Sequence, residues 1–361
     1  MSYPADDDTT TAVRPGMGFD VARLEAWLAD RLDGFRGPVS VRQFKGGQSN
    51  PTYLLTARGG RYVLRRKPPG PLLASAHAVD REYRVVTALG AHAAVPVART
   101  LALCTDDAVI GSWFYVMEHV AGRVYWDPAL PGLPREARRG HYDAMVGALA
   151  SLHRVDPVAV GLADFGRASG YLPRQIARWA KQYHEDEAAG RIDSMDRVID
   201  WLQANLPATE PGPAIVHGDF RLDNLMFDRH APRVLAVLDW ELSTIGDPIA
   251  DFAYHLMPWR MRSPLLPGLA DLDLDALGIP GEGEQVAAYC RLTGREALPD
   301  LDFYLAFCMF RLAGIFHGIR GRVLRGTAVS ARAREYAAQA DAMAGLAWAQ
   351  ARRGRSADPR H

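Results

Sequence analysis

The pattern of apolar and polar positions predicts a strand-rich N-terminal region followed by a helical remainder. After an apolar stripe at helical spacing in residues 21–32, short apolar runs bounded by Gly, Pro and Asn indicate β-strands. These strands are expected at residues 39–44, 52–57, 62–66, 95–104 and 112–118. Helices are expected at residues 75–89, 141–153, 173–184, 198–206, 284–292, 301–319 and 327–351, and one more should begin at Pro248, behind an Asp247 N-cap.

This order of elements suggests two lobes, because 361 residues exceed one ordinary core. Five strands around one helix would form an α+β lobe that ends near Val120, and helices would form most of the second lobe. We expect a disordered arm (residues 1–16), an N-terminal lobe (17–120), a C-terminal lobe (121–352) and a flexible tail (353–361).

The charge balance and the cysteines argue against several classes of protein. Lys+Arg and Asp+Glu both number 42, so no overall basic field favours nucleic acid or an anionic membrane. Three widely spaced cysteines indicate neither a disulfide framework nor a zinc site. The N-terminus is polar and acidic, and no run of ~18 apolar residues occurs. We therefore expect a cytoplasmic protein without nucleic-acid or membrane partners, either a monomer or a homodimer.

The candidate chemistry lies in residues 215–251, which contain Asp219, Asn224 and Asp239. Two short strands are expected at residues 225–227 and 234–238, and antiparallel pairing would bring Asn224 and Asp239 to the same end of this hairpin. Their oxygens, with phosphate oxygens, suit Mg²⁺. Asp219 would accept a proton from a substrate hydroxyl, so the set indicates phosphoryl transfer. The alternative is that Asp219 is a turn residue, Asn224 a helix cap and Asp239 a strand terminator.

Glu82 falls on the apolar stripe of the helix expected at residues 75–89, where an unpaired carboxylate would be costly. Its expected partner is a cation from the preceding strand, either Arg65, Arg66 or Lys67. The alternative is that Arg65 and Glu82 are both surface residues.

A glycine-bearing turn precedes the second expected strand, and paired glycines let backbone N–H groups approach an anion closely. This turn is weak evidence alone, because most such turns only join two strands. Its candidate phosphate-covering residues are Gly46, Gly47, Gln48, Ser49 and Asn50.

The run His217-Gly218-Asp219, with Asn224 five residues after Asp219 and then Asp239-Trp240-Glu241, has the order of a kinase catalytic loop and its metal-binding Asp. It resembles the aminoglycoside phosphotransferase family more than the protein kinases. The resemblance implies a two-lobed protein-kinase-like fold, with a small antiparallel-sheet N-lobe that binds nucleotide and a mainly helical C-lobe for catalysis and substrate.

The resemblance also implies roles for residues of this region. Asp219 would be the catalytic base, and Asn224 and Asp239 would be magnesium ligands. His217 would brace the loop, and Asp251 would support it by bonding the backbone near residues 217–219.

Further implied roles concern the nucleotide. Arg65 would replace the family's usual Lys, pair with Glu82 and hold the phosphates, while the turn at residues 46–50 would cover them. The backbone of Glu118 and Val120 would hydrogen-bond the purine, although an ordinary buried strand explains these two residues as well.

In the C-lobe, the resemblance places Gln175, Arg178 and Trp179 on the substrate side, although a solvated amphipathic face explains them equally. His153 ends an apolar stripe and is expected to be a packed residue without a role.

The stretches FKGGQSNPTY, YVLRRKPPG and VHGDFRLDNLMFD are similar to those of kinase-like domains found alone in bacteria or fused to acyl-CoA dehydrogenases. This subgroup implies an ATP- and Mg²⁺-dependent transfer of the γ-phosphate to a hydroxyl of a small molecule, with a hydroxyacyl-CoA as the implied acceptor. A basic group that would hold a CoA phosphate, or form a solvated helix face, comprises Arg320, Arg322, Arg325, Arg332 and Arg334.

Two other functions stay open. An aminoglycoside or other small-alcohol kinase would need an acidic acceptor pocket for a polycation, and the candidates are Asp271, Asp273, Asp275, Glu282 and Glu284. A nucleotide-binding pseudokinase scaffold is disfavoured, because Asp219, Asn224 and Asp239 are all present.

Overall fold

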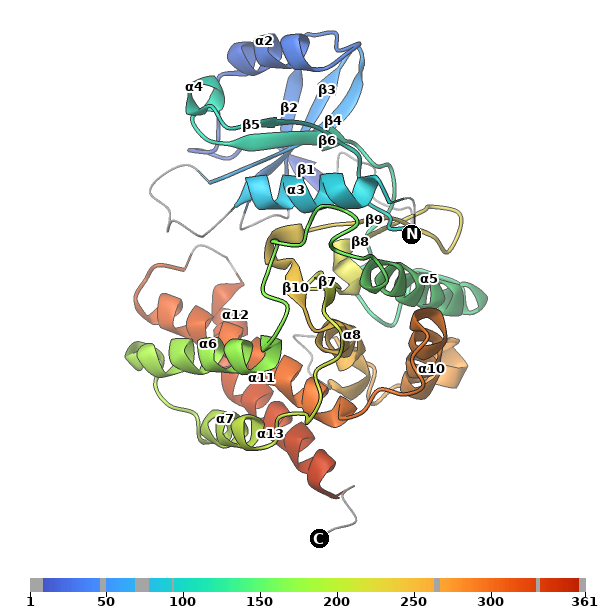
Figure 1. The fold of residues 1–361 in the computed structure, drawn as a ribbon. Coiled ribbons are helices and arrows are strands. Elements are labelled where there is room, and N and C mark those ends of the chain that lie inside the picture. Colours follow the sequence, from blue (N-terminus) through green and yellow to red (C-terminus); the bar gives the residue numbers. More distant parts are fainter. Residues whose placement is uncertain are drawn as a thin grey trace. The chain divides into compact units, whose positions relative to one another are not determined.

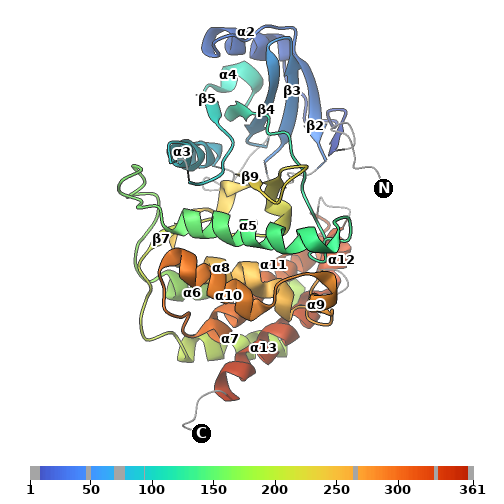
Figure 2. The same cartoon turned by 90° about the vertical axis from the view of Figure 1, so that its right-hand side faces the viewer.

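The computed structural model describes residues 9–45, 50–68, 78–92, 94–262, 267–328 and 332–356 (Figures 1 and 2). The chain divides into two compact units. Unit 1 takes its described residues from Met1–Arg123, Val160–Leu162 and Leu225–Ser243, and unit 2 takes the rest of the chain. Unit 1 therefore includes a later segment, 225–243, that the expected lobe boundary near residue 120 did not assign to it.

Unit 1 is built on a six-stranded antiparallel sheet in the order β1-β2-β3-β4-β6-β5 (Figure 1). Its elements are β1 (Thr10–Thr11), α2 (Val21–Arg31), β2 (Ser40–Phe44), β3 (Thr52–Ala57), β4 (Gly60–Arg66), α3 (Val79–Gly90), β5 (Thr100–Cys104), α4 (Asp107–Ile110), β6 (Phe114–Glu118), β8 (Leu225–Phe227), β9 (Val234–Val237) and the 3-10 turn η3 (Trp240–Leu242).

Two helices cover opposite faces of this sheet. Leu24 and Leu28 of α2 pack with Leu64 of β4 in one buried cluster. The next residue of β4, Arg65, points to the other face, because successive side chains of a strand alternate, and there it meets Glu82 of α3. The sheet thus has one more strand, β1, than the five expected, and two helices cover it where one was expected.

Unit 2 is mainly helical, with one short antiparallel pair formed by β7 and β10. Its elements are α5 (Arg135–His153), α6 (Tyr171–Glu185), η1 (Glu187–Ala189), α7 (Asp193–Ala204), β7 (Ala214–Val216), η2 (Leu222–Asn224), β10 (Thr244–Gly246), α8 (Pro248–Leu256), η4 (Met257–Arg260), α9 (Leu274–Leu277), α10 (Glu282–Thr293), α11 (Leu301–Leu324), α12 (Ala333–Ala338) and α13 (Ala340–Ser356).

Helix α11 is the core helix of unit 2, where it packs against α6, α7, α8, α12 and α13. By length and composition alone, this helix could cross a membrane, and it is the only such helix in the described part of the chain. Its apolar window is 83% buried inside the structure, as in the core helix of a globular protein.

Several sequence predictions need correction. The arm to residue 16 was expected to be disordered, yet Thr10 and Thr11 pair with Phe44 and Gln43 of β2. The strand expected at 95–104 starts only at Thr100, because Pro96 cannot donate to a sheet ladder. The tail was expected from residue 353, but α13 extends to Ser356.

Two predicted helices were also wrong in their limits. The helix expected at 198–206 already begins at Asp193, since Asp193 and Asp196 in its first turn favour the positive end of the helix dipole. The single helix expected at 327–351 is two helices, α12 and α13, that separate at Gln339. No Gly or Pro marks that break in the sequence.

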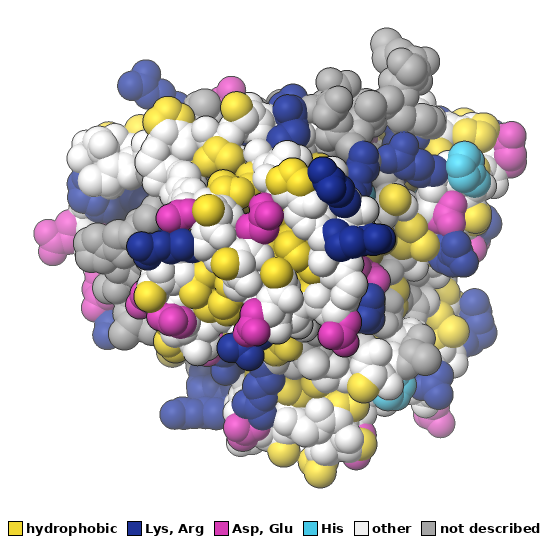
Figure 3. Space-filling view, turned by 90° about the horizontal axis from the view of Figure 1, so that it is seen from above, with side chains coloured by type: hydrophobic (Ala, Val, Ile, Leu, Met, Phe, Trp, Pro, Cys, Tyr) yellow, Lys and Arg dark blue, Asp and Glu magenta, His cyan; other side chains and the backbone are white. Residues whose placement is uncertain are grey.

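The charged side chains of the described residues are mixed in sign over the face drawn in Figure 3. This mixing agrees with the equal numbers of acidic and basic residues in the chain.

Candidate active site

The buried ion pair predicted for unit 1 is confirmed. Arg65 Nε lies 2.6 Å from Glu82 Oε2, and Arg65 Nη2 lies 3.4 Å from Glu82 Oε1. Glu82 also accepts hydrogen bonds from Asn50 Nδ2 at 2.5 Å and from Tyr115 OH at 3.2 Å. With its side chain 1% exposed, Glu82 needs these donors, because a buried carboxylate without partners is strongly destabilising.

The alternation of β4 explains why Arg65, and not its neighbours, pairs with Glu82. Arg66 points to the opposite face, where its Nε donates to Ser112 Oγ at 2.9 Å. Lys67 lies 3.9 Å from Asp80 and 4.0 Å from the centre of the Trp113 ring. Of the three cations that the sequence left open, Arg65 is therefore the one that forms the ion pair with Glu82.

Asp239 joins the same cluster from the end of the β8–β9 hairpin. Arg65 Nη2 donates to Asp239 Oδ1 at 2.5 Å, and Glu241 Oε2 lies 3.9 Å from the same nitrogen. Burial opposes the charge of Arg65, but Glu82 and Asp239 raise its pKa above the ordinary value. One cation, Arg65, thus faces the carboxylates of Glu82, Asp239 and Glu241.

The backbone of Asp239 is in the left-handed region, with a φ of +63°. A residue other than Gly is strained there by roughly 1–3 kcal/mol, so the surroundings must impose this conformation. The hairpin itself matches the sequence prediction, with Leu225 paired to Val237 and Phe227 to Val234.

The structure describes only some of the other residues predicted to bind nucleotide. Gly46, Gly47, Gln48 and Ser49 lie outside the described residues. The backbone N–H of Glu118 donates to the carbonyl of Arg99 at 2.9 Å, so this amide is not available to a purine. The nucleotide roles of Asn50, Val120 and the carbonyl of Glu118 stay predictions.

In unit 2, the loop after β7 is held as predicted by Asp251 of α8. Asp251 Oδ2 accepts the backbone N–H of His217 at 2.6 Å, and its Oδ1 accepts that of Gly218 at 2.8 Å. Helix α8 begins at Pro248 behind the Asp247 cap, also as predicted. Although burial opposes it, the hydrogen bonds from the His153 side chain and from the His217 backbone lower the pKa of Asp251.

His153, to which the sequence analysis gave no role, is a partner of Asp251. Its Nε2 lies 3.2 Å from Asp251 Oδ2, and its Nδ1 lies 2.7 Å from the hydroxyl of Tyr289. A carboxylate oxygen only accepts, so the Nε2–H of His153 donates to Asp251. A signal was present, since His153 is a polar residue at the end of an apolar stripe.

Asp219 lies directly after the two amides that Asp251 holds. Its own N–H donates to His217 Nδ1 at 3.2 Å. Asn224 Nδ2 donates to the Asp219 carbonyl at 2.9 Å and to Oδ2 at 3.0 Å. The amide nitrogen of Asn224 is thereby turned toward Asp219, which turns its oxygen elsewhere. An amide oxygen is the atom that a hard cation would bind.

Two residues near the Asp219 carboxylate were not predicted. Tyr254 shares a side-chain hydrogen bond with it, and burial together with the charge of Asp219 raises the pKa of Tyr254. Tyr254 therefore stays protonated and donates. Arg221 Nε lies 3.8 Å from Asp219 Oδ2, and Arg221 Nη2 lies 2.6 Å from Asp223. No sequence signal separated these two residues from other charged or aromatic positions.

Magnesium needs hard oxygen donors. The described residues contain no group of three or more His, Cys, Asp or Glu side chains that would hold a metal alone. In unit 1, the carboxylate of Asp239 is an oxygen donor of the kind that a hard cation prefers, and in unit 2 the amide oxygen of Asn224 is another. The chemistry of each donor fits magnesium, which would take its remaining ligands from phosphate and water.

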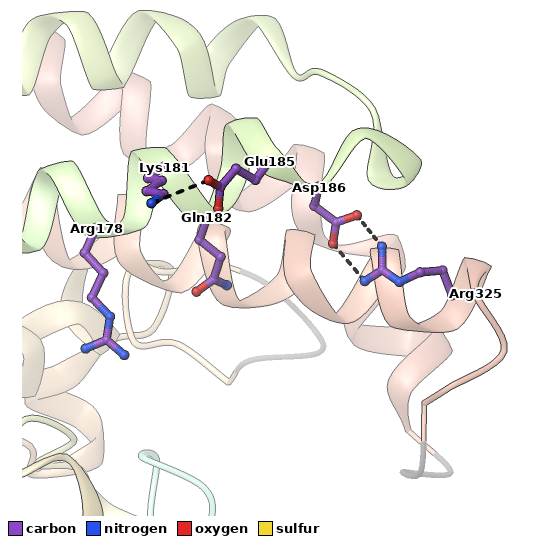
Figure 4. Close-up of a pocket in the computed structure, with 6 residues that line it drawn as sticks. All are labelled: Arg178, Lys181, Gln182, Glu185, Asp186 and Arg325. Carbon is purple, nitrogen blue, oxygen red and sulfur yellow. Dashed lines mark hydrogen bonds and ion pairs between the residues drawn. The ribbon is translucent and has the colours of Figure 1, made fainter. Parts of the chain in front are cut away.

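The predicted substrate-side face of α6 divides into two environments. Trp179 packs inward, with its ring centre 6.0 Å from the Arg311 guanidinium. Arg178 instead lines an open groove of about 610 Å³ along α6 and the end of α11 (Figure 4). The groove's other charges are largely paired, Lys181 with Glu185 at 3.6 Å, and Asp186 with Arg325 at 2.5 Å.

Three of the five residues in the acidic group, and three of the five in the basic group, are engaged in ion pairs. In the acidic group, the pairs are Asp271 with Arg262 (3.2 Å), Glu282 with Arg260 (2.5 Å) and Glu284 with Arg139 (2.9 Å). In the basic group, they are Arg320 with Asp341, Arg325 with Asp186, and Arg332 with Glu335. Neither group is a concentrated field of one sign.

Comparison with known proteins identifies relatives over most of the chain. The model of the phosphotransferase enzyme family matches residues 40–304. Acyl-CoA dehydrogenase family member 10 of Mus musculus is 44% identical over 342 residues, and acyl-CoA dehydrogenase family member 11 of Gallus gallus is 43% identical over 338 residues. The matches cover 94% and 91% of this chain but only 32% and 43% of those proteins.

Solved structures extend the likeness to the fold. A structure from Ralstonia eutropha JMP134, provisionally named an aminoglycoside phosphotransferase, has 49% identity and a TM-score of 0.85, and covers 93% of this chain and 99% of its own. A mutant of aminoglycoside phosphotransferase APH(4)-Ia, solved with ADP and hygromycin B, has 18% identity and a TM-score of 0.58, with 91% and 98% covered. The predicted kinase-like α+β fold is confirmed.

Proposed function

Because the chain belongs to the phosphotransferase enzyme family, we propose that it transfers the γ-phosphate of ATP to a hydroxyl group of a small molecule, with Mg²⁺ as the metal. The observation that carries this proposal is the loop His217–Asp219. Three consecutive backbone N–H groups of this loop are bound by Asp251 and His217, and Asn224 is bonded to the Asp219 carboxylate. A carboxylate that is fixed in this way is suited to orient a hydroxyl and to receive its proton.

In the proposed reaction, the acceptor oxygen forms a bond to the γ-phosphorus while the bond from that phosphorus to the bridging oxygen breaks, and ADP leaves. The acceptor proton passes to Asp219. Arg65 would contact the phosphates through Nη1, which makes a long hydrogen bond of 3.5 Å to Thr52 Oγ1, because Nε and Nη2 are used by Glu82 and Asp239. Bound Mg²⁺ would neutralise charge on the phosphates, and Asn224 and Asp239 would hold it.

The proposed acceptor is a hydroxyacyl-CoA. One observation supports it over a polycationic aminoglycoside: the curated relatives that match most of this chain carry acyl-CoA dehydrogenase names. Aminoglycosides and other small alcohols stay the alternative acceptors, since APH(4)-Ia was solved with hygromycin B.

A transfer assay with γ-labelled ATP tests the proposal. The purified chain is offered hydroxyacyl-CoAs, aminoglycosides, choline-like alcohols and sugars, with and without Mg²⁺, and Asp219→Asn serves as the inactive control. Metal-dependent labelling of a hydroxyacyl-CoA is expected. Labelling of an aminoglycoside alone would replace the acceptor, whereas ATP binding without transfer to any acceptor or to water would favour a pseudokinase scaffold.

A further inference from the structure

Arg311 lies in the middle of the core helix α11 and is 8% exposed. Its Nη2 donates to the backbone carbonyl of Gly218 at 2.6 Å. Its guanidinium carbon lies 5.3 Å from the ring centre of Tyr254 and 6.0 Å from that of Trp179, within the range of cation–π attraction. No carboxylate among the described residues lies within ion-pair distance of Arg311.

Burying an arginine at this position destabilises the fold. The neighbouring residues Phe310, Leu312 and Ala313 are buried and apolar, and a buried cation without an ion-pair partner loses its hydration without full compensation. Burial opposes the charge, but neighbouring groups, the carboxylate of Asp219 among them, nevertheless raise the pKa of Arg311. The residue therefore stays charged, with Asp219 as one source of compensation.

The contact made by Arg311 acts on the peptide unit that directly precedes Asp219. The oxygen of that unit is the Gly218 carbonyl, bound by Arg311 at 2.6 Å, and its N–H is that of Asp219, bound to His217 Nδ1 at 3.2 Å. Gly218 has a φ of +83°, in the left-handed region that favours Gly. The plane of this peptide is thus fixed from both ends, which sets the direction in which the Asp219 side chain leaves the backbone.

We propose that Arg311 is a positioning residue for phosphoryl transfer: it fixes the Gly218–Asp219 peptide and so aims the Asp219 carboxylate at the acceptor hydroxyl. This inference rests on the proposed role of Asp219. Asp251 and Arg311 then bind different backbone groups of the loop. The carboxylate of Asp251 accepts from the N–H groups of His217 and Gly218, and the guanidinium of Arg311 donates to the carbonyl of Gly218.

The test uses Arg311→Met, which keeps the length and apolar stem but removes the donors and the charge, and Arg311→Lys, which keeps the charge and one donor group. The matched control is Arg138→Met. Arg138 also bonds backbone carbonyls, those of Leu133 and Leu277, but they belong to other parts of unit 2. Circular dichroism establishes that each variant is folded.

The first measurement is turnover of γ-labelled ATP, with water as the acceptor where no other is used, alongside ATP affinity by calorimetry. Arg311→Met should lower kcat by about 10²-fold, as expected when a reacting group is misplaced by about 1 Å. ATP affinity should change less than about threefold, and Arg311→Lys should recover part of kcat. A purely structural role would give Arg311→Met the same kcat as Arg138→Met, and this result would overturn the inference.

The second measurement needs no activity. Hydrogen exchange of the segment 215–222 should be faster in Arg311→Met than in the wild type and in Arg138→Met, because the Asp219 amide loses its fixed plane. Unchanged exchange there would also overturn the inference. If the wild type turned over no ATP, the proposed function would fail while this readout still decided whether Arg311 holds the loop. If Arg311→Met did not fold, Arg311→Lys would be measured by both methods with the same criteria.

Discussion

The buried pair of Arg65 and Glu82 can be separated into a stabilising part and a nucleotide-binding part by two substitutions. Arg65→Met removes the cation and leaves Glu82 in place, 1% exposed and bonded only to the neutral donors Asn50 and Tyr115. Leaving one partner of a buried pair uncompensated costs about 3–5 kcal/mol. We therefore expect unit 1 of Arg65→Met to lose about that much stability.

The double variant Arg65→Met/Glu82→Gln should recover most of this loss. Glutamine keeps a carbonyl oxygen that can accept from Asn50 and Tyr115, but it carries no charge that needs compensation. Replacing a buried ion pair as a whole is often neutral, so about 2–3 kcal/mol should return. ATP affinity should not return, because the proposed phosphate contact belongs to Arg65 itself.

Stability is measured by urea unfolding, followed through hydrogen exchange of β4 and β6 so that unit 1 is read alone, and ATP affinity is measured by calorimetry. The control is Arg99→Met, which breaks the exposed pair with Glu118 at 3.7 Å and should cost less than about 1 kcal/mol. ATP binding by the double variant at wild-type strength would refute the phosphate role of Arg65. Equal stability of the single and double variants would refute the account of the buried charge.

Three other predictions concern the loop, the metal and pH. Asp219→Asn should slow single-turnover transfer by ~10²- to 10⁴-fold with little change in ATP affinity, and loss of ATP binding with normal transfer at saturation would make Asp219 a metal or structural residue instead. Asp239→Asn should abolish turnover in a folded protein, and wild-type activity at low Mg²⁺ would contradict its assignment. Burial lowers the pKa of His255 from 6.5 to about 4, so the unfolded state binds the extra proton between these values, and stability should fall by about 3 kcal/mol as pH drops from 6.5 to 4. In His255→Phe, the midpoint of urea unfolding should depend less on pH over that range. An unchanged pH slope would show that His255 is not the group responsible.

The sequence predicted those features that depend on local pattern. The limits of α2, β3 and α6, the β8–β9 hairpin and the start of α8 all follow from periodicity, turn residues or a cap that lie within a few positions. The break between α12 and α13 could not be predicted, because the Ala-rich segment favours helix throughout, whereas in the structure both helices pack on α11. Tertiary contacts here override a uniform local preference.

The separation of partners along the sequence also explains which functional residues the sequence predicted. Glu82, His153 and Arg311 share one sequence signal, an ionisable residue on the apolar face of a helix, and each one binds part of the candidate site. Only Glu82 was assigned, because its partner lies 17 residues earlier in the adjacent strand. His153 meets Asp251 across 98 residues and Arg311 meets Gly218 across 93, and no local pattern names such partners. A buried ionisable side chain without a partner destabilises a fold. An ionisable residue on an apolar helix face therefore predicts a polar partner, even where the sequence does not say which residue that partner is.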